Sequence, residues 1–286
     1  MYETSIAHFA DLVRDKAAGM REAPWGFFVG AMLAGGYIGI AMILALSASA
    51  GLDPGVRPLV RGAVFGLGLI LTVFAGAELF TGYTMYLGFG LARRSVTAAA
   101  AAVAMPVVWV GNLAGSLILT GLFAVGGGGA VFADGGEALA AYAGHKADSG
   151  AVELLARAAL CNWLVCLSIW TAARVKGDAA KCVVLAWILF AFVAAGFEHS
   201  VANMTALSLG LFQPGSEVSW VGSAHNLLWV TLGNVIGGAV FVVGGYLAAA
   251  KTDPREGAPR HDCGPLPASS QPIPAPPAAP AAKQAA

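Results

Sequence analysis

The chain has 286 residues, of which 58% are hydrophobic and only 11% are charged, and its formal net charge is zero. A soluble domain carries about 25% charged residues, so the composition excludes an ordinary soluble domain and favours an integral membrane protein. The zero net charge gives no indication of a nucleic-acid partner. None of the 4 cysteines is spaced for a metal site, and we expect neither a metal nor a cofactor.

Residues 1–24 form a mixed, amphipathic stretch that lacks the apolar core of a secretory signal. We expect a cytoplasmic N-terminal segment there, followed by an all-α membrane domain over residues 25–251. That domain holds six apolar segments, and each has the roughly 20 helical residues that cross a bilayer. The segments lie near residues 27–50, 62–90, 98–125, 152–173, 182–209 and 223–249.

Two of these segments, 62–90 and 182–209, are too long and too often interrupted by glycine for single plain helices. Helix breaks at membrane depth are tolerated only where the backbone lines a cavity or is buried in protein. We therefore expect broken helices in the second and fifth spans.

The distribution of lysine and arginine predicts the orientation, because cytoplasmic loops are enriched in both. Most of these residues lie in stretches that face inward if both termini are cytoplasmic, and six spans satisfy that requirement. Residues 252–286 are rich in proline and alanine and cannot bury a core, so we expect a disordered cytoplasmic tail.

The two halves of the chain repeat two short motifs at nearly equal spacing. Ala-Gly-Ala-Glu at 75–78 matches Ala-Gly-Phe-Glu at 195–198, and Gly-Asn at 111–112 matches Gly-Asn at 233–234. Three spans per copy is an odd number, so the second copy is inverted in the bilayer. Inverted repeats with paired broken helices are typical of transporters and channels, whose sites lie near the breaks.

The most polar part of the fifth span contains Glu198, His199 and Asn203 within an otherwise apolar stretch. Ionisable groups at membrane depth usually face a bundle interior or a pore. A histidine can hold or release a proton near neutral pH. This segment therefore predicts a membrane path for a small ion, with His199 at its centre.

With these motifs the chain resembles the formate/nitrite transporter family over residues 1–250, and within it the nitrite branch (NirC-type). The family motifs are Glu-Leu-Phe-Thr-Gly at 78–82, Gly-Asn at 111–112, Leu-Cys-Asn-Trp-Leu-Val-Cys-Leu at 160–167 and Gly-Phe-Glu-His-Ser-Val-Ala-Asn-Met at 196–204. The branch is indicated by Thr84-Met85, the glycine run 126–129 and the stretch 225–234.

The resemblance implies a homopentamer of aquaporin-like protomers in the bacterial inner membrane. Each protomer of such a pentamer has its own pore for a small weak-acid anion. The implied partners are this anion, protons, further copies of the chain and membrane lipid.

The resemblance places His199 in the pore between two apolar constrictions. A proton donated from His199, or relayed through it, would turn nitrite into neutral nitrous acid, which crosses an apolar gate at lower cost. The alternative keeps the ring neutral and lets the local field act. The resemblance also implies that Lys146, in an outer loop, concentrates anions at the outer mouth, and that the Thr81 hydroxyl donates to an anion near His199.

The remaining predicted site residues form constrictions or brace the breaks. The expected constrictions on the cytoplasmic side are Phe65, Leu69 and Phe192, and those beside Thr81 are Leu79 and Phe80. Asn162 and Asn203 are expected to face the pore or to brace the broken spans. Glu78 and Glu198 are expected to satisfy backbone amides freed by the breaks, with matching structural parts for Asn112 and Asn234.

Several alternatives stay open on the sequence alone. The pore chemistry hardly separates nitrite from formate or hydrosulfide, and the preference for nitrite rests on the resemblance. An intramembrane enzyme is a remote alternative, since the sequence has neither HExxH nor GxSxG. In the family the segment before the first span can cover the inner mouth and move with pH, so acid-dependent gating is a hypothesis here.

Overall fold

The computed structural model describes residues 2–252, and all regular secondary structure in that range is helical. The predicted tail of residues 252–286 lies outside the described residues, except for Thr252, which ends the last helix. The helices are α1 (Glu3–Glu22), α2 (Pro24–Ser49), α3 (Arg57–Leu71), α4 (Phe80–Ala92), α5 (Ala98–Val125), α6 (Gly129–Phe132), α7 (Gly136–Asp148), α8 (Ala151–Ala172), α9 (Asp178–Ala194), α10 (Ser200–Phe212), α11 (Trp220–Ile236) and α12 (Gly245–Thr252). Two π-helical stretches, η1 (Thr72–Gly76) and η2 (Gly237–Gly244), continue α3 and α11.

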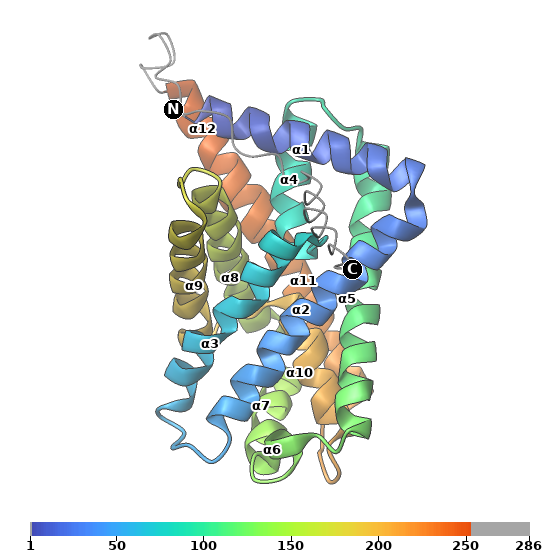
Figure 1. Ribbon diagram of the computed structural model, residues 1–286, viewed down its shortest axis with the longest axis vertical. Helices are drawn as coiled ribbons and strands as arrows, with labels where there is room; N and C mark the ends of the chain where they lie inside the picture. Colours follow the sequence, from blue (N-terminus) through green and yellow to red (C-terminus); the bar gives the residue numbers. More distant parts are fainter. Residues whose placement is uncertain (1, 253–286) are drawn as a thin grey trace, which may run out of the picture.

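Five helical stretches in the described range are long and apolar enough to cross a membrane. They are Pro24–Ser49, Arg57–Gly76, Ala98–Val125, Ala151–Ala172 and Trp220–Ala250. Long helices run along the long axis of the molecule, with α1 lying across one end and α6 and α7 at the other (Figure 1). The chain is therefore a multi-pass membrane protein.

Two helical segments are interrupted inside this bundle. The helix formed by α3 and η1 ends at Gly76, and α4 begins only at Phe80. In the same way α9 ends at Ala194 and α10 begins at Ser200. Gly76 and Gly196 have φ angles of +77° and +72°, a conformation that glycine adopts without strain, and each turns the chain out of its helix.

Neighbouring helices approach closely at glycines in equivalent pairs. A Cβ added at Gly115 of α5 would collide with the carbonyl oxygen of Met32 in α2. A Cβ added at Gly233 of α11 would collide with that of Leu155 in α8. Small residues of this kind bring membrane helices into backbone contact, so α2 packs tightly on α5 and α8 on α11, and we call these four helices the frame.

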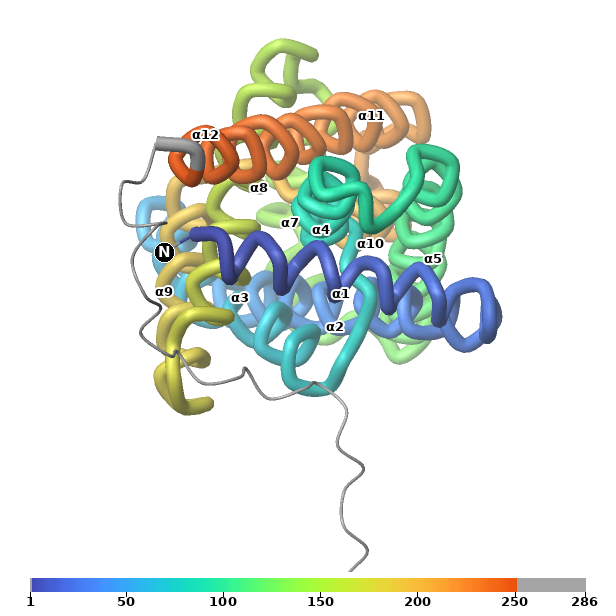
Figure 2. Tube along the Cα trace, turned by 90° about the horizontal axis from the view of Figure 1, so that it is seen from above, coloured from blue at the N-terminus to red at the C-terminus, as the bar shows by residue number. Residues whose placement is uncertain are grey.

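Helix α1 is amphipathic and lies across the end of the bundle, over α2 and α4 (Figure 2). Its buried face includes Ile6, Phe9 and Val13. The Phe9 ring stacks on those of Tyr86 and Trp170, with centroids 5.6 and 5.8 Å away. The predicted N-terminal segment is therefore a docked helix that covers one end of the frame.

Candidate functional site

The first interruption is braced by a single asparagine of α5. The backbone N–H of Phe80, which opens α4, donates to Oδ1 of Asn112 at 2.9 Å. The side-chain amide of Asn112 donates to the carbonyl oxygens of Ala31 at 2.7 Å and Glu78 at 2.8 Å. One buried side chain thus satisfies both the freed amide and a freed carbonyl.

The second interruption is braced in the same way from α11. The backbone N–H of Ser200 donates to Oδ1 of Asn234 at 2.9 Å. The amide of Asn234 donates to the carbonyl oxygens of Ala158 at 2.9 Å and Glu198 at 3.0 Å. The repeated Gly-Asn motif therefore supplies one brace to each break.

The two glutamates have a different role from the predicted one. Glu78 accepts from the Lys16 ammonium of α1 at 2.6 and 2.7 Å, and Glu198 accepts from Lys146 of α7 at 2.8 and 2.9 Å. These carboxylates were expected to satisfy freed backbone amides, but in the described residues they accept from lysine ammonium groups, while the asparagines accept from the first amide of each half-helix. We call these contacts the α1 ion pair (Lys16–Glu78) and the α7 ion pair (Lys146–Glu198).

His199 is the last residue before α10 and is buried. Its Nδ1 accepts from the backbone N–H of Ala202 at 3.2 Å, and its Nε2 lies 3.2 Å from Oγ1 of Thr81. Because Nδ1 is an acceptor, a neutral ring carries its proton on Nε2. The ring thus directs an N–H toward Thr81, the residue expected beside it.

A cavity of about 310 Å³ reaches His199 from the α7 end of the molecule. Its lining includes six predicted site residues: Phe65, Lys146, Phe192, Glu198, His199 and Asn203. The rings of Phe65 and Phe192 meet edge to face with centroids 5.9 Å apart, next to the imidazole. We call this cavity the α7 vestibule.

The position of the two rings corrects a prediction. The sequence placed Phe65 and Phe192 on the opposite side of His199 from Lys146, but all of them line the α7 vestibule. Helix spacing gives a shared face but not the direction of a helix relative to the break. Leu69, one turn beyond Phe65 on α3, is buried and does not line the vestibule.

Lys146 also differs from its prediction as a loop residue. It lies in helix α7, and its side chain is only 5% exposed because the carboxylate of Glu198 and the ring of Tyr142 enclose it. Asn203 joins this cluster by donating to Glu198 at 2.5 Å and to Asn226 at 2.8 Å. The ammonium is therefore fixed at the base of the vestibule.

Three further predicted residues lie around the breaks. Leu79 precedes α4 and is buried, whereas Phe80 faces a groove on the side of the bundle. The amide of Asn162 donates to the Thr81 carbonyl, the Thr84 hydroxyl and the Asn234 carbonyl at 3.2, 2.9 and 2.6 Å. Asn162 therefore ties the two breaks together.

The sequence model of the formate/nitrite transporter family matches residues 7–248. The chain belongs to the formate/nitrite transporter family. It is 46% identical to the nitrite transporter NirC of Escherichia coli (strain K12) over 224 residues, which are 78% of this chain and 83% of that protein. It is 39% identical to a probable formate transporter of Methanothermobacter thermautotrophicus, covering 77% of this chain and 88% of that one.

Two solved structures are similar to this family member. An FNT family ion channel has a TM-score of 0.82 at 40% identity, with 86% of this chain and 99% of that chain covered. A pentameric formate channel with formate bound has a TM-score of 0.70 at 31% identity, with 81% and 99% covered. These relatives are transporters and channels, so the remote enzyme alternative gains no support.

Several charged residues of this transporter escaped sequence reasoning. Arg61 and Arg157 line the α7 vestibule, and Lys16 forms the α1 ion pair. A signal for Lys16 existed, because it precedes the first span of its half just as Lys146 precedes the first span of the second half. The two arginines had no motif around them and stood at the ends of apolar segments.

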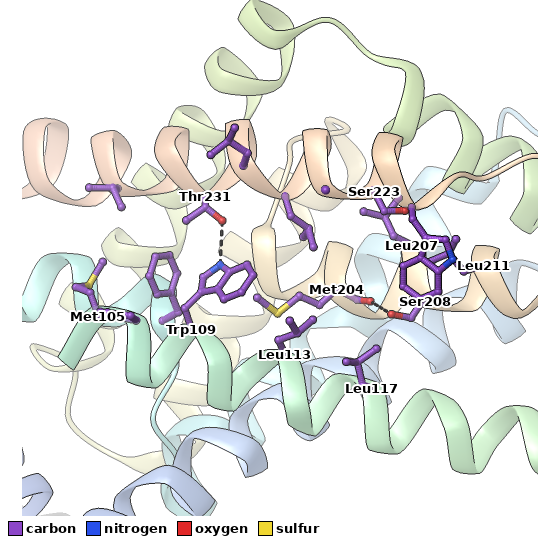
Figure 3. A pocket seen from close by; sticks show the side chains of 17 residues that line it. Met105, Trp109, Leu113, Leu117, Met204, Leu207, Ser208, Leu211, Ser223 and Thr231 are labelled. Atoms are coloured by element: carbon purple, nitrogen blue, oxygen red, sulfur yellow. Dashed lines mark hydrogen bonds between the residues drawn. The ribbon is translucent and has the colours of Figure 1, made fainter. Parts of the chain in front are cut away.

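A larger groove of about 690 Å³ lies on the side of the transporter, between α5, α10 and α11. Its lining is almost entirely apolar, and the indole N–H of Trp109 crosses it to the Thr231 hydroxyl at 3.0 Å (Figure 3). An anion loses its hydration in such a place without compensation. The α7 vestibule, with its cations, is therefore the better candidate for the substrate path.

Proposed function

We propose that this protein carries nitrite across the bacterial cytoplasmic membrane through a pore in each protomer. The observation that carries the proposal is the α7 vestibule, which is lined by cations and reaches His199, whose Nε2 lies 3.2 Å from the hydroxyl of Thr81. Nitrite is the favoured substrate because the nitrite transporters NirC of Escherichia coli and Salmonella typhimurium share 46% and 44% identity with the chain.

We infer a six-span protomer built as an inverted 3+3 repeat, in which α3 with α4 and α9 with α10 form the broken spans. The equivalent braces by Asn112 and Asn234 support this arrangement, because each serves the start of one half-helix. The pentameric formate channel supports a homopentamer. Both termini are cytoplasmic in this proposal, with α1 as the N-terminal segment of residues 1–24 and the α7 vestibule outside.

The mechanism follows from the order of groups along the vestibule. An anion is drawn to the cations that line the vestibule, passes the rings of Phe65 and Phe192, and reaches the donors of Thr81 and His199. There the ammonium of Lys146, whose charge is largely balanced by Glu198, adds only a local favourable field. The anion that has lost water is stabilised by these groups until it moves past the apolar side chains of Leu69 and Leu79.

His199 acts in this scheme either as a proton donor or as a neutral hydrogen-bond donor. The bond from the Ala202 N–H to Nδ1 supports the second role, because it keeps the ring proton on Nε2, facing Thr81. Full donation of that proton requires Nδ1 to take up another proton and to release the Ala202 N–H. The two roles differ in their dependence on pH, which the flux experiment below measures.

Formate is the second candidate substrate. The probable formate transporter is 39% identical, and the pentameric formate channel has a TM-score of 0.70. Formate and nitrite are both small, planar and singly charged, and the donors of Thr81 and His199 suit either one. Hydrosulfide has the same charge, but it has no oxygen atoms to accept from these donors.

The deciding experiment is uptake of nitrite, formate and hydrosulfide by the purified protein in proteoliposomes, with and without a proton gradient. We expect saturable nitrite uptake that exceeds formate uptake. His199→Ala should lower nitrite flux about 10- to 100-fold, the equivalent of a lost hydrogen bond to a charged group. His225→Ala, on α11 and outside the α7 vestibule, is the matched control and should transport normally.

Two outcomes would contradict the proposal. Liposomes containing the wild-type protein that take up none of the three anions would refute anion transport. A His199→Ala variant with normal flux and an unchanged pH profile would remove the histidine from the mechanism.

A further inference from the structure

The α7 vestibule is lined by more cations than the proposed mechanism uses. Lys146 and His145 come from α7, Arg61 from the start of α3 and Arg157 from α8. All four lie along the wall of the cavity that reaches His199. The charge each one offers to an incoming anion depends on the groups that already neutralise it.

Two of the permanent cations have carboxylate partners. The Lys146 ammonium is held by Glu198 at 2.8 and 2.9 Å. The Arg157 guanidinium lies 2.9 Å from the carboxylate of Glu153, and its Nη1 is also 3.3 Å from Nε2 of His145. Their charges are therefore largely balanced inside the vestibule wall.

Arg61 differs from both. Its Nε donates to the hydroxyl of Ser49 at 2.8 Å, and its guanidinium lies 4.5 Å from the ring centroid of Tyr142. Within residues 2–252 it has no carboxylate partner. Both contacts leave Nη1 and Nη2 available, because Ser49 binds at Nε and Tyr142 stacks on the face of the group.

The shape of a guanidinium decides which anions it binds well. It is planar and presents parallel N–H donors that match the two oxygens of a carboxylate-like anion. Nitrite and formate have that planar two-oxygen shape, whereas chloride and hydrosulfide do not. The ring of Tyr142 and the hydroxyl of Ser49 hold the guanidinium in place, so less side-chain entropy is lost when the anion binds.

We propose that Arg61 forms a binding site for planar two-oxygen anions in the α7 vestibule, ahead of His199. The nitrogens Nη1 and Nη2 bind the two oxygens together, and the anion then moves inward past Phe65, one turn along the same helix. This step rests on the proposed function, since it selects the substrate that the pore then carries. It gives the vestibule a preference for nitrite and formate over spherical anions.

The test compares Arg61→Ala and Arg61→Lys with Arg57→Ala. Arg57 lies one turn earlier on α3, is half-buried, and does not line the vestibule, so its loss removes the same charge and leaves the lining of the site in place. Nitrite uptake is measured over a range of concentrations, with chloride as a competitor. Arg61→Gln replaces the alanine variant if the latter does not assemble.

We expect Arg61→Ala to raise the half-saturating nitrite concentration about 10-fold, in line with the loss of a charged hydrogen-bonding group. The maximal flux should change less than twofold, because the groups near His199 remain. Arg61→Lys should restore the attraction of anions but allow chloride to compete better, since an ammonium lacks the parallel N–H donors of a guanidinium. Arg57→Ala should behave as the wild type.

A second readout measures binding without transport. Nitrite should raise the midpoint of thermal unfolding of the wild type and of Arg57→Ala. It should raise the midpoint of Arg61→Ala much less. If the wild type shows this shift and moves no anion, the site stands and the proposed transport function fails. An unchanged half-saturation in Arg61→Ala, equal effects of Arg61→Ala and Arg57→Ala, or no shift in the wild type would each overturn the site.

Discussion

The two interrupted helices share a scaffold and differ in chemistry. Leu79 and His199 each stand immediately before a half-helix, with φ and ψ of −93° and 124° for Leu79 and −109° and 115° for His199. Asn112 and Asn234 each brace the residue that follows. One break thus presents an apolar side chain where the other presents an imidazole, so the two breaks share a backbone geometry and differ in the chemistry of the residue that precedes the half-helix.

The two ion pairs beside the breaks also differ, in how deeply their side chains are buried. The side chains of the α7 ion pair are 5% and 4% exposed, whereas those of the α1 ion pair are 22% and 18% exposed. A buried pair loses far more when one partner is removed, because the remaining charge cannot be hydrated. The α7 pair is therefore a fixed part of the structure, and the α1 pair can be opened at lower cost.

The largest expected effect tests this difference directly. Glu198→Ala should destabilise the protein by about 3–5 kcal/mol, because it leaves the buried Lys146 ammonium without its carboxylate. Glu78→Ala should cost roughly 1 kcal/mol, since Lys16 can turn to water. The measurement is the midpoint of thermal unfolding in detergent. Equal shifts in the two variants would show that the pairs are energetically alike.

A smaller effect tests whether chemistry is confined to one break. Thr81 and Val201 are each the second residue of their half-helix, and only Thr81 contacts Nε2 of His199. Thr81→Val should lower nitrite flux about fivefold, the equivalent of a neutral hydrogen bond. Val201→Thr should leave flux unchanged. A normal flux in Thr81→Val would exclude its hydroxyl from the anion path.

The sequence was most informative where the two halves repeat. The motifs at 75–78 and 195–198 locate both interruptions, because each carries the glycine with positive φ that ends a helix. His199 stood out since an ionisable residue in an apolar span is rare. The Gly-Asn motifs indicated the asparagine braces, although their hydrogen-bond partners could be seen only in the folded chain.

The sequence was least informative where a contact joins distant elements. The partners of Glu78 and Glu198 come from helices 62 and 52 residues away, and a carboxylate gives no sign of whether it will meet an amide or an ammonium. The placement of Phe65 and Phe192 failed because helical spacing does not reveal which end of a pore a face points to. Arg61 lies at the edge of an apolar run, where an arginine is usually a solvent-exposed charge at the end of a membrane span.

The smallest expected effect concerns helix α1, which carries the more exposed of the two ion pairs. Burial lowers the pKa of His8, and the nearby carboxylate of Asp11 raises it by a smaller amount. Docked α1 therefore binds a proton less well than undocked α1. The docking of α1 should be unaffected by pH above the ordinary histidine pKa of about 6.5, and should weaken as the pH falls below that pKa.

Hydrogen exchange of the α1 amides at pH 5.5 and 7.5 measures this docking. We expect lower protection of these amides, relative to the intrinsic exchange rate at each pH, at pH 5.5 than at pH 7.5 in the wild type, and a reduced difference in His8→Gln, whose side chain does not titrate in this range. Glu78→Gln should speed exchange at both pH values, because it opens the α1 ion pair without adding a titrating histidine. If removal of residues 1–20 leaves the pH profile of nitrite uptake unchanged, α1 does not gate the pore, and the weaker ion pair only holds a helix in place.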